Sequence, residues 1–587
     1  MMLAMDNQKI SDIFQEIANM MEIKGENRFR TIAYSRGAQI VRSLGFNLND
    51  VVLDNISKLR EIPGIGQILS EKIAELVLTG QCEFHQQLRS EFPPGLLDML
   101  RVRTVGPKKV QMFYGTLGIK NITELQKAAE EGRLRDLPKM GEKSEKEILA
   151  AILEYQAMPH ERRSIHEAYL EAEKYVSYLK KFDGVARVQY AGSLRRGMET
   201  IGDVDILSSI EKFSEKKAEK VFAYFWEYPD ISKVLSRGPT KSSVLLNSGI
   251  QVDLRVMEDS IFGAALHYFT GSKAHNIRIR DRAKKMGLKV NEYGVFEIHG
   301  EREILVSGKT EEDLFAKIGF PFIPPQLRED RGEVEWAQLG KAFPKLVELE
   351  DLRGNLHSHS EWSDGSEPLE TVARGYMELG FEYIAMTDHS KAVGITQGLN
   401  DEKAQEYFQE IDCVQKKVGA KFRILKGSEV DILKNGSLDY SDKVLRQFDL
   451  LVASVHSHFK LPREEQTKRI LKAVTSGKIH VLGHPTGRLI NERTAIEYDM
   501  EAVMKACVDH HVALEINGSP SRMDLCDVHV KMGKDLGAKF VISTDSHNAS
   551  HRQFLRYGIL TAQRGWLTKE DVLNTMPLKK MMEYWKR

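Results

Sequence analysis

The C-terminal part of the chain, beyond about residue 350, repeats one pattern that fixes its fold class. Short apolar runs alternate with helical patterns, and most runs end in a side chain that can bind a metal, as in 355–359, 383–389 and 450–456. Seven such runs separated by helices predict parallel strand–helix units. In a closed α/β barrel the active site lies at the carboxyl ends of the strands. We therefore expect a barrel with a catalytic centre built at one end.

Nine side chains at or near these strand ends form the predicted metal site. They are His357, His359, Asp364, His389, Glu429, His456, His484, Asp545 and His547. This number exceeds what one ion needs and fits a cluster of two or three divalent metals, with Glu429 as the predicted bridge. Mixed imidazole and carboxylate ligands suit Zn²⁺, Mn²⁺ or Fe, between which the sequence does not choose. A lone strand-end histidine is more often structural, but nine such residues together favour ligation; Glu515 and Asn517 stay undecided.

A second constellation lies near residue 200. A turn that contains Gly192 and Arg196 leads to Asp203 and Asp205 on an apolar strand. Strand alternation places both carboxylates on one face, about 6–7 Å apart, which suits a pair of Mg²⁺ ions. The glycine lets backbone N–H groups approach a phosphate, and the arginine offers it a charged fork. Asp253, on the next alternating run, would join the pair if the two strands are neighbours and could accept the proton of an attacking hydroxyl.

Further along come Tyr268-Phe269-Thr270-Gly271-Ser272 and then Asn276 and Arg280. With these motifs, residues 160–325 resemble the palm and thumb of DNA polymerase family X, the polymerase β type. The resemblance implies nucleotidyl transfer from a dNTP to a primer 3′-OH, with Mg²⁺ or Mn²⁺ in the palm. The implied roles are metal binding for Asp203, Asp205 and Asp253, triphosphate binding for Ser193, Arg196 and Gly202, nucleotide contacts for Tyr268, Phe269, Gly271 and Asn276, and a template contact for Arg280.

The N-terminal third contains three similar units, each with an apolar run, a glycine-bearing hairpin and a second helix. They resemble the helix-hairpin-helix module, whose glycines, here Gly64, Gly66, Gly106 and Gly141, expose backbone N–H groups to phosphate without reading bases. We expect sequence-independent DNA binding. In the family a lysine in the setting of Lys72 forms a Schiff base with an abasic sugar. Ile68 stands where lyase members carry another lysine, and this departure favours the alternative, in which Lys72 only contacts phosphate or solvent.

Composition limits the remaining alternatives. The net charge is zero, which leaves phosphate contacts to backbone N–H groups and bound metals. Four cysteines lie far apart without a Cys-x-x-Cys pair, as in a reducing compartment. No apolar run approaches the length of a membrane span, so the expectation is a cytoplasmic monomer without a membrane partner, associated with the nucleoid while acting on DNA.

The C-terminal region resembles the PHP (polymerase and histidinol phosphatase) domain, and the order of domains resembles bacterial and archaeal PolX enzymes. The expected fold is multidomain: an all-α helix-hairpin-helix region, an α+β nucleotidyltransferase palm and thumb, and a distorted seven-stranded α/β barrel, similar to a TIM barrel. The predicted domains are 1–90 and 91–158 (helix-hairpin-helix), 159–260 (palm), 261–325 (thumb), 326–350 (linker) and 351–587 (PHP).

This resemblance implies a DNA repair polymerase that fills short gaps in gapped or primer-template DNA. The PHP site would act as a metal-dependent 3′–5′ exonuclease. Cutting at abasic sites and trimming of 3′ ends are further reactions that the resemblance implies for it. Three alternatives stay open: a PHP phosphatase, a PHP domain that only stabilises the fold, and a scaffold that binds gapped DNA without catalysis.

Overall fold

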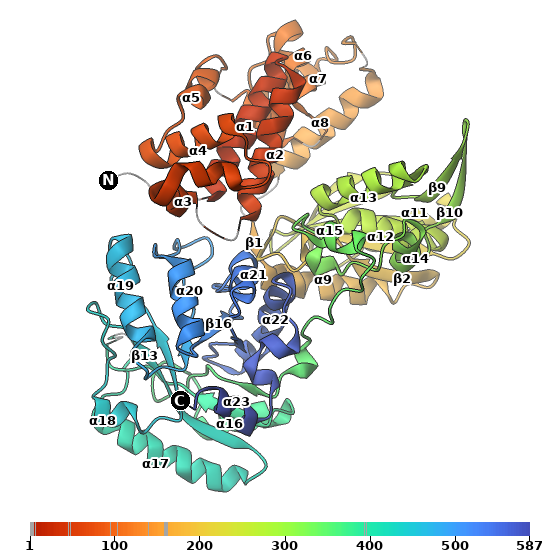
Figure 1. Cartoon of the computed structure of the whole chain (residues 1–587). Helices are drawn as coiled ribbons and strands as arrows, with labels where there is room; N and C mark the ends of the chain where they lie inside the picture. Colours follow the sequence, from red (N-terminus) through yellow and green to blue (C-terminus); the bar gives the residue numbers. More distant parts are fainter. Residues whose placement is uncertain are drawn as a thin grey trace. The chain divides into compact units, whose positions relative to one another are not determined.

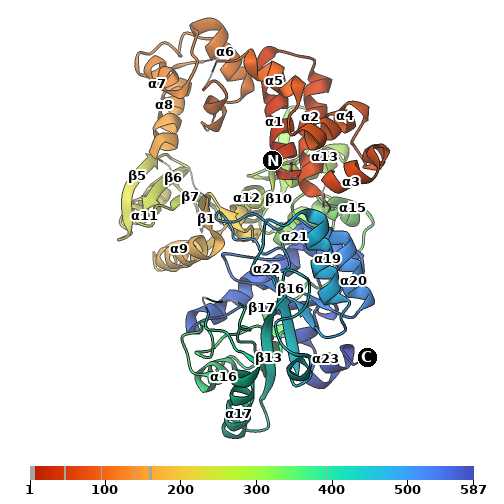
Figure 2. The ribbon, with the colours of Figure 1, turned by 90° about the vertical axis from the view of Figure 1, so that its left-hand side faces the viewer.

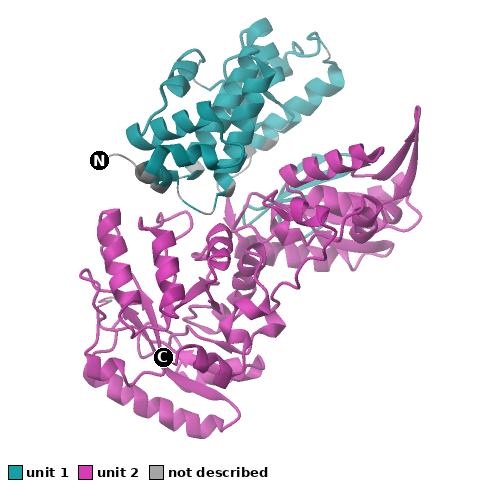
Figure 3. Cartoon of the chain, viewed as in Figure 1, with its two compact units in different colours: residues 1–161, 226–253 teal, residues 162–225, 254–587 magenta. Residues whose placement is uncertain are grey.

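The computed structural model describes residues 5, 7–44, 46, 48–93, 95–102, 104–138, 140–157, 162–392, 394 and 396–586. The chain divides into two compact units, residues 1–161 with 226–253 and residues 162–225 with 254–587 (Figure 3). The predicted boundary between residues 158 and 159 lies outside the described residues. A search of the described ranges found no helix with the length and apolar character needed to cross a membrane.

The N-terminal region is helical, as predicted (Figure 1). Its α-helices are α1 (Asn7–Lys24), α2 (Arg28–Ser43), α3 (Leu48–Asn55), α4 (Gln67–Thr79), α5 (Glu83–Ser90), α6 (Pro107–Leu117), α7 (Ile122–Glu130) and α8 (Glu142–Ala157), with 3-10 turns η1 (Ile56–Glu61) and η2 (Leu97–Arg101). Apolar residues at helical spacing, such as Ile10, Phe14, Ile17 and Met21 of α1, are fully buried in one core. A second core, which includes Phe113 and Ile148, holds the later helices together.

The same hairpin occurs three times in this region. The backbone N–H groups of Ile65, Val105 and Met140 each donate to the carbonyl oxygen three residues earlier, at 3.0 Å in all three cases. The hairpins lead into α4, α6 and α8. This repetition confirms the predicted helix-hairpin-helix region.

The region after residue 162 is mixed α/β. β1 (Arg163–Ser164) pairs antiparallel with β3 (Thr200–Ile201), and β2 (Val185–Tyr190) with β4 (Asp203–Ile210). Its helices are α9 (Ile165–Leu179), α10 (Gly192–Arg195) and α11 (Glu215–Trp226). In the first unit, β5 (Ile231–Arg237) pairs antiparallel with β6 (Lys241–Leu246). The strand β7 (Gln251–Glu258) is divided between the units after Asp253.

The following segment forms a small antiparallel sheet covered by helices. The sheet order is β10-β9-β8. The elements are η3 (Asp259–Ile261), α12 (Phe262–Thr270), α13 (Lys273–Lys285), β8 (Leu288–Asn291), β9 (Gly294–His299), β10 (Arg302–Ser307) and α14 (Glu311–Lys317).

The segment 326–350, predicted as a linker, packs against this region. It contains the end of η4 (Pro325–Leu327), α15 (Glu333–Gln338) and the start of η5 (Leu349–Asp351). Leu327, Val334 and Leu346 are buried in one core with Phe315 of α14 and Trp566 from the C-terminal barrel. The polymerase-like part and the barrel therefore share a hydrophobic core.

The C-terminal part is a seven-stranded parallel sheet in the order β11-β12-β13-β14-β15-β16-β17. Figure 2 labels β13, β16 and β17 of this sheet. The strands are β11 (Gly354–Asn355), β12 (Tyr383–Met386), β13 (Arg423–Asp431), β14 (Leu450–Ser454), β15 (Val481–Leu482), β16 (Ala513–Asn517) and β17 (Phe540–Ser543). Beyond the first and last strands, the N–H of His359 donates to the carbonyl oxygen of Ser546 at 2.9 Å, and the N–H of Asp545 to that of His357 at 3.1 Å. These bonds nearly close the sheet, which confirms the predicted distorted barrel.

Helices cover the outside of the barrel (Figure 1). They are α16 (Leu369–Glu378), α17 (Asp401–Val418), α18 (Asp442–Leu445), α19 (Arg463–Val474), α20 (Met500–Asp509), α21 (Asp527–Asp535) and α22 (Leu555–Arg564). The 3-10 turns are η6 (Ala549–Phe554), η7 (Lys569–Asp571) and η8 (Leu573–Thr575), and the last helix is α23 (Leu578–Tyr584). Inside the strands, Leu356, Leu425 and Val452 form a second core together with Met581 and Trp585 near the chain end. The interior of the barrel is therefore filled with apolar side chains. The polar side chains lie at the carboxyl ends of the strands.

Candidate metal centre and nucleotide site

The barrel strands deliver the predicted ligands to one end. His357, His389 and His456 each follow the last residue of a strand by two or three positions, whereas Glu429 lies within β13. All strands run in parallel, so their carboxyl ends meet at the same rim. Eight of the nine predicted ligands fall into three overlapping groups, within each of which the ligand atoms lie within 4.8 Å of one another. The groups are His359, Asp364, His389 and His547; His357, His359, Glu429 and Asp545; and His389, Glu429 and His456.

Glu429 lies at the centre of the site. Its Oε2 is 3.3 Å from His357 Nε2 and 3.0 Å from His389 Nδ1. Its Oε1 is 3.1 Å from His456 Nε2 and 2.7 Å from His484 Nε2. His484, which belongs to none of the three groups, therefore reaches the site through Glu429. One carboxylate thus faces four imidazoles from four strand ends, and its role as a bridge between metals stays a prediction.

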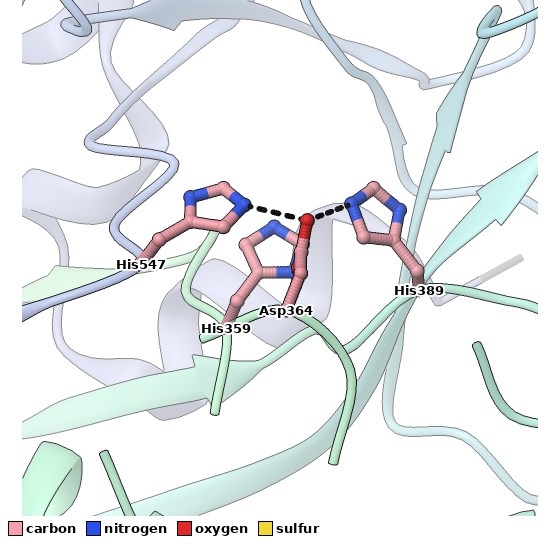
Figure 4. A group of neighbouring side chains, drawn as sticks. All are labelled: His359, Asp364, His389 and His547. Carbon is pink, nitrogen blue, oxygen red and sulfur yellow. Dashed lines mark ion pairs between the residues drawn. The ribbon is translucent and has the colours of Figure 1, made fainter. Parts of the chain in front are cut away.

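Asp364 organises the outer side of the site (Figure 4). Its Oδ2 is 3.3 Å from His547 Nε2 and 3.6 Å from His389 Nε2, and its Oδ1 is 3.6 Å from His359 Nδ1. Asp364 is half-exposed, whereas His359 is fully buried. This group is therefore the part of the site most open to solvent and to a substrate.

The donor atoms fit divalent metals. Within the described part of the chain, His357 Nε2, His359 Nε2 and His456 Nε2 are buried and make no hydrogen bond. Burial lowers the pKa of His456, but the negative charges of Glu429 and of Asp431, whose Oδ2 lies 3.6 Å from Nδ1, outweigh it and raise the pKa to about 9. Burial raises the pKa of Glu429, but the surrounding histidines hold it well below its usual value. Buried nitrogens that point at carboxylates without bonding them are what a metal cluster would complete.

Two of these residues have a strained backbone. His484 has φ +24° and Asp545 has φ +53°, both in the left-handed region that non-glycine residues rarely adopt. Such conformations cost free energy and persist where the surrounding structure enforces them. Both side chains reach the site: His484 Nε2 lies 2.7 Å from Glu429 Oε1, and Asp545 Oδ1 lies 3.1 Å from His359 Nε2.

Supporting residues surround the nine predicted ligands. Glu515 Oε1 lies 2.7 Å from His357 Nδ1, and its Oε2 accepts the backbone N–H of His484 at 2.6 Å. Asn517 Nδ2 donates to Asp545 Oδ2 at 3.1 Å, and Arg522 Nε lies 3.3 Å from the same oxygen. The sequence left Glu515 and Asn517 undecided and gave no sign of Arg522. The signal available for the first two was their place at the end of β16.

The predicted palm motif brings a glycine against a carboxylate. Asp203 and Asp205 lie on β4 and can offer oxygens within 4.8 Å of each other. Gly192 has φ +61°, and a Cβ there would lie 2.5 Å from Asp205 Oδ2. The backbone N–H of Ala191 also donates to the Asp205 carbonyl oxygen at 2.8 Å. Only glycine permits this close approach.

The predicted nucleotide contacts gather around α10, α12 and α13. Arg196 Nη1 donates to the carbonyl oxygen of Thr270, and a Cβ on Gly271 would lie 3.2 Å from the same nitrogen. Asn276 Nδ2 donates to the carbonyl oxygen of Tyr268 at 2.7 Å, which ties α13 to α12.

The other residues predicted to contact the nucleotide or the template lie in or next to α10, α12, α13 and β4. The Tyr268 and Phe269 rings are 5.1 Å apart, and Arg280 Nε donates to the carbonyl oxygen of Asn276 at 3.3 Å. Ser193 lies in α10, and Gly202 directly precedes β4.

Asp253, the third predicted carboxylate, belongs to the first compact unit. There it is buried, forms an ion pair with Lys241, and accepts a hydrogen bond from Gln251 Nε2 at 2.8 Å. Its place beside Asp203 and Asp205 stays a prediction.

The predicted DNA-binding glycines lie just before helices. Gly66 and Gly106 are the N-caps of α4 and α6, Gly141 directly precedes α8, and a Cβ at any of the three would meet no atom within 4 Å. Gly64 has φ +88° in the first hairpin. A Cβ at Gly64 would lie 2.4 Å from Ile40, so the backbone is sterically open at Gly66, Gly106 and Gly141 and closely packed at Gly64.

Lys72, the predicted lyase residue, forms an ion pair in this structure. Its Nζ is 2.7 Å from Glu75 Oε2. Partial burial lowers the pKa of Lys72, but the hydrogen bond and charge of Glu75 outweigh it and raise the pKa. A Schiff-base nucleophile needs the neutral amine, which this pairing disfavours.

The sequence matches four known domain families. They are a helix-hairpin-helix domain over residues 5–82, a SAM-like helix-hairpin-helix tandem over 96–152, the DNA polymerase beta thumb over 265–329 and the PHP domain over 355–519. Their order follows the predicted order of domains.

Two relatives are informative. The DNA polymerase/3′-5′ exonuclease PolX of Bacillus subtilis (strain 168) is 34% identical over 586 residues, covering 99% of this chain and all of that protein. A probable phosphatase of Thermoanaerobacter sp. (strain X514) is 27% identical over 244 residues, covering 39% of this chain and 94% of that protein.

Proposed function

We propose a function for each of two metal sites from the premise that this chain belongs to the PolX family, the family X DNA polymerases that carry a C-terminal PHP domain. The chain is a DNA-directed DNA polymerase with a 3′–5′ exonuclease, and its partners are DNA and dNTPs. Both sites use divalent metals. The observation that supports the exonuclease is the gathering of eight imidazole and carboxylate ligands, with His484 joined to them through Glu429, on a chain that also holds the palm motif.

In the palm, Asp203, Asp205 and Asp253 would hold Mg²⁺ or Mn²⁺, and Asp253 would accept the proton of the primer 3′-OH. Ser193, Arg196 and Gly202 would bind the triphosphate. The forced approach of Gly192 to Asp205 supports this, because it fixes the phosphate-binding turn against a metal ligand. The Asn276–Tyr268 hydrogen bond would hold the nucleotide-contacting ends of α12 and α13 together.

In the barrel, the nine ligands would hold two or three ions of Zn²⁺, Mn²⁺ or Fe. When bound, such ions act as Lewis acids and supply an activated water for phosphodiester hydrolysis. The chain's own residues orient the site: Glu515 fixes the His357 ring, and Asn517 holds Asp545. Asp364, the most exposed ligand, would meet the 3′ end of the DNA first.

A labelled-primer assay tests both sites at once. A 5′-labelled primer on one-nucleotide-gapped DNA is incubated with Mn²⁺, with and without dNTPs. We expect longer products with dNTPs and shorter ones without them. Asp253→Ala should abolish lengthening only, and His456→Ala shortening only. His299→Ala, an exposed histidine on β9, is the control and should change neither. Binding without any change in primer length would overturn the proposal and favour a scaffold.

A second function for the barrel is phosphatase activity. The probable phosphatase among the relatives matches most of its own length to this region. Cutting at abasic sites and removing 3′-blocking phosphates use the same phosphoester chemistry, so we include both in the proposal. Hydrolysis of p-nitrophenyl phosphate without shortening of DNA would assign the site to small phosphomonoesters instead.

A further inference from the structure

A row of charged side chains runs from the palm to the PHP barrel within the second compact unit. Arg196 Nε donates to Glu329 Oε1 at 2.8 Å, and Arg564 Nη1 donates to the same oxygen at 3.0 Å. Arg564 Nη2 donates to Asp527 Oδ2 at 2.6 Å, which also accepts from Arg331 Nη1 at 2.9 Å. Arg564 and Asp527 belong to α22 and α21 of the barrel. Two arginines, one from each domain, therefore share a single carboxylate oxygen.

The contact is tightly built. The Arg564 side chain is 3% exposed, and its Nη1 also donates to the backbone carbonyl oxygen of Arg196 at 2.9 Å. Gly197 has φ +71°, and a Cβ there would lie 3.1 Å from Leu560 of α22. Helix α22 therefore packs closely against the turn that contains Arg196. Charged hydrogen bonds at these distances in a buried setting are strong.

Glu329 accepts a hydrogen bond from the guanidinium of Arg196, the group proposed to bind the triphosphate. In the proposed function Arg196 binds the triphosphate, yet in this structure its Nε is already bonded to Glu329. An incoming triphosphate must share that guanidinium with Glu329 or displace it. Arg196 and Arg564 both donate to the same oxygen of Glu329. The positive charge of Arg564 therefore weakens the attraction between Glu329 and Arg196.

We propose that Glu329 and Arg564 are positioning residues that set the affinity of the polymerase site for the incoming dNTP. Glu329 restrains Arg196, and Arg564, supplied by the PHP barrel, weakens that restraint and adds positive potential beside it. This inference rests on the proposed triphosphate role of Arg196. It gives the barrel a part in nucleotide addition that is separate from its metal centre.

The test compares two charge-removing variants in the full chain, by steady-state primer extension. Glu329→Gln should lower the KM for dNTP by about three- to tenfold, because the negative charge at Arg196 Nε is removed and Arg564 adds uncompensated positive charge. Arg564→Gln should raise that KM by a similar factor, because Glu329 then bonds to Arg196 alone. In both variants kcat should change less than KM, and shortening of the primer without dNTPs should persist.

Matched variants keep the test sharp. Arg556 lies on the same helix, pairs with Glu173 of α9 at 3.5 Å and lies over the Tyr169 ring at 4.5 Å. Arg556→Gln therefore removes a cation from a contact between this helix and the palm that does not include Arg196, and it should leave the KM for dNTP unchanged. Arg564→Lys keeps the charge and should restore part of the wild-type KM if Arg564→Gln folds poorly. Melting curves of each variant identify a folding defect.

The outcomes separate this inference from the proposed function. If Arg196→Ala leaves the KM for dNTP unchanged, the triphosphate role itself fails. If Arg196→Ala raises the KM but Glu329→Gln and Arg564→Gln shift it in the same direction or not at all, only the positioning role is wrong.

Discussion

At the residue scale, His357 shows how the barrel prepares a buried imidazole. Glu515 Oε1 lies 2.7 Å from its Nδ1, which directs Nε2 toward Glu429 and Asp545. A carboxylate behind a metal-binding histidine fixes the tautomer and raises its basicity. The strand-end position predicted the histidine, but its carboxylate partner is set by contacts across 158 residues of sequence. No local pattern could have assigned that pairing.

We expect Glu515→Gln to weaken metal binding about 10- to 100-fold, because the charge behind His357 is lost. Competition of the metal-free protein with a chelator for Zn²⁺ or Mn²⁺ measures this directly. Glu382→Gln removes a carboxylate from an exposed pair with Arg353 and serves as the control. Equal affinities of both variants and the wild type would show that Glu515 does not support the metal site.

Gly192 makes a second prediction at this scale. Gly192→Ala would place a Cβ 2.5 Å from Asp205 Oδ2 at a backbone φ of +61°. We expect primer extension to fall by about 100-fold or more, since displacement of a metal-binding carboxylate disrupts the catalytic geometry. The exonuclease should persist.

The control for strain is Gly184→Ala, where φ is +94° but a Cβ meets no atom within 4 Å. If both glycine variants lose extension equally, backbone strain rather than the collision with Asp205 is responsible.

At the element scale, the predicted apolar runs and the observed barrel strands agree, because each run is short, apolar and bounded by a polar strand end. The helical hairpins agree for a similar reason: glycine and helical periodicity are local signals. The segment 326–350 differs. The proline cluster just before it and its run of charges are typical of a linker, yet Arg328 and Glu333 of this region are fully buried. Their burial depends on partners in distant elements, which sequence patterns do not reveal.

Glu311 of α14 holds this segment in place. It bonds Arg195 Nη2 at 2.6 Å and the fully buried Arg328 Nη1 at 2.5 Å. Burial raises the pKa of Glu311, but the charges of Arg328 and Arg195 outweigh it and lower the pKa to about 2. Since the folded-state pKa lies below the ordinary 4.5, the stabilisation is complete above pH 4.5 and is lost as the pH falls toward about 2.

Glu311→Gln should therefore reduce the free energy of unfolding by about 3 kcal/mol at neutral pH, because Arg328 is left buried and uncompensated. Denaturant midpoints of wild type and variant, taken at neutral pH and at about pH 3.5, measure this. The difference in midpoint between wild type and Glu311→Gln should be smaller at about pH 3.5 than at neutral pH. Glu312→Gln, on the exposed side of the same helix, should cost little. An equal gap at both pH values would contradict the assignment.

At the scale of the whole molecule, motif order predicted the succession of domains but not how the chain divides into compact units. Residues 226–253, which the sequence-based prediction assigned to the palm, belong to the same compact unit as the N-terminal helices. Trp566 of the barrel packs in the same core as Val334 and Phe315, 5.9 Å from the Trp336 ring. Such packing joins segments far apart in sequence, so composition and spacing carry no trace of it.

A chain that ends at residue 350 should consequently have a less stable polymerase region than the full chain. Loss of a buried tryptophan from a core costs about 3–5 kcal/mol. Thermal unfolding and size-exclusion chromatography compare the truncated chain with full-length His359→Ala, which lacks the nuclease ligand but keeps the core. Identical melting temperatures would show that the shared core contributes nothing.

The shared core also bears on how such enzymes can change over evolutionary time. If a lineage that no longer needs the nuclease deleted the part of the gene that encodes the barrel, the hydrophobic core that the barrel shares with the polymerase region would be exposed to solvent. Mutational decay of the ligands leaves that core intact and is the easier route. We therefore expect nuclease-deficient descendants to retain the barrel as a pseudoenzyme, with eroded histidines and a preserved tryptophan.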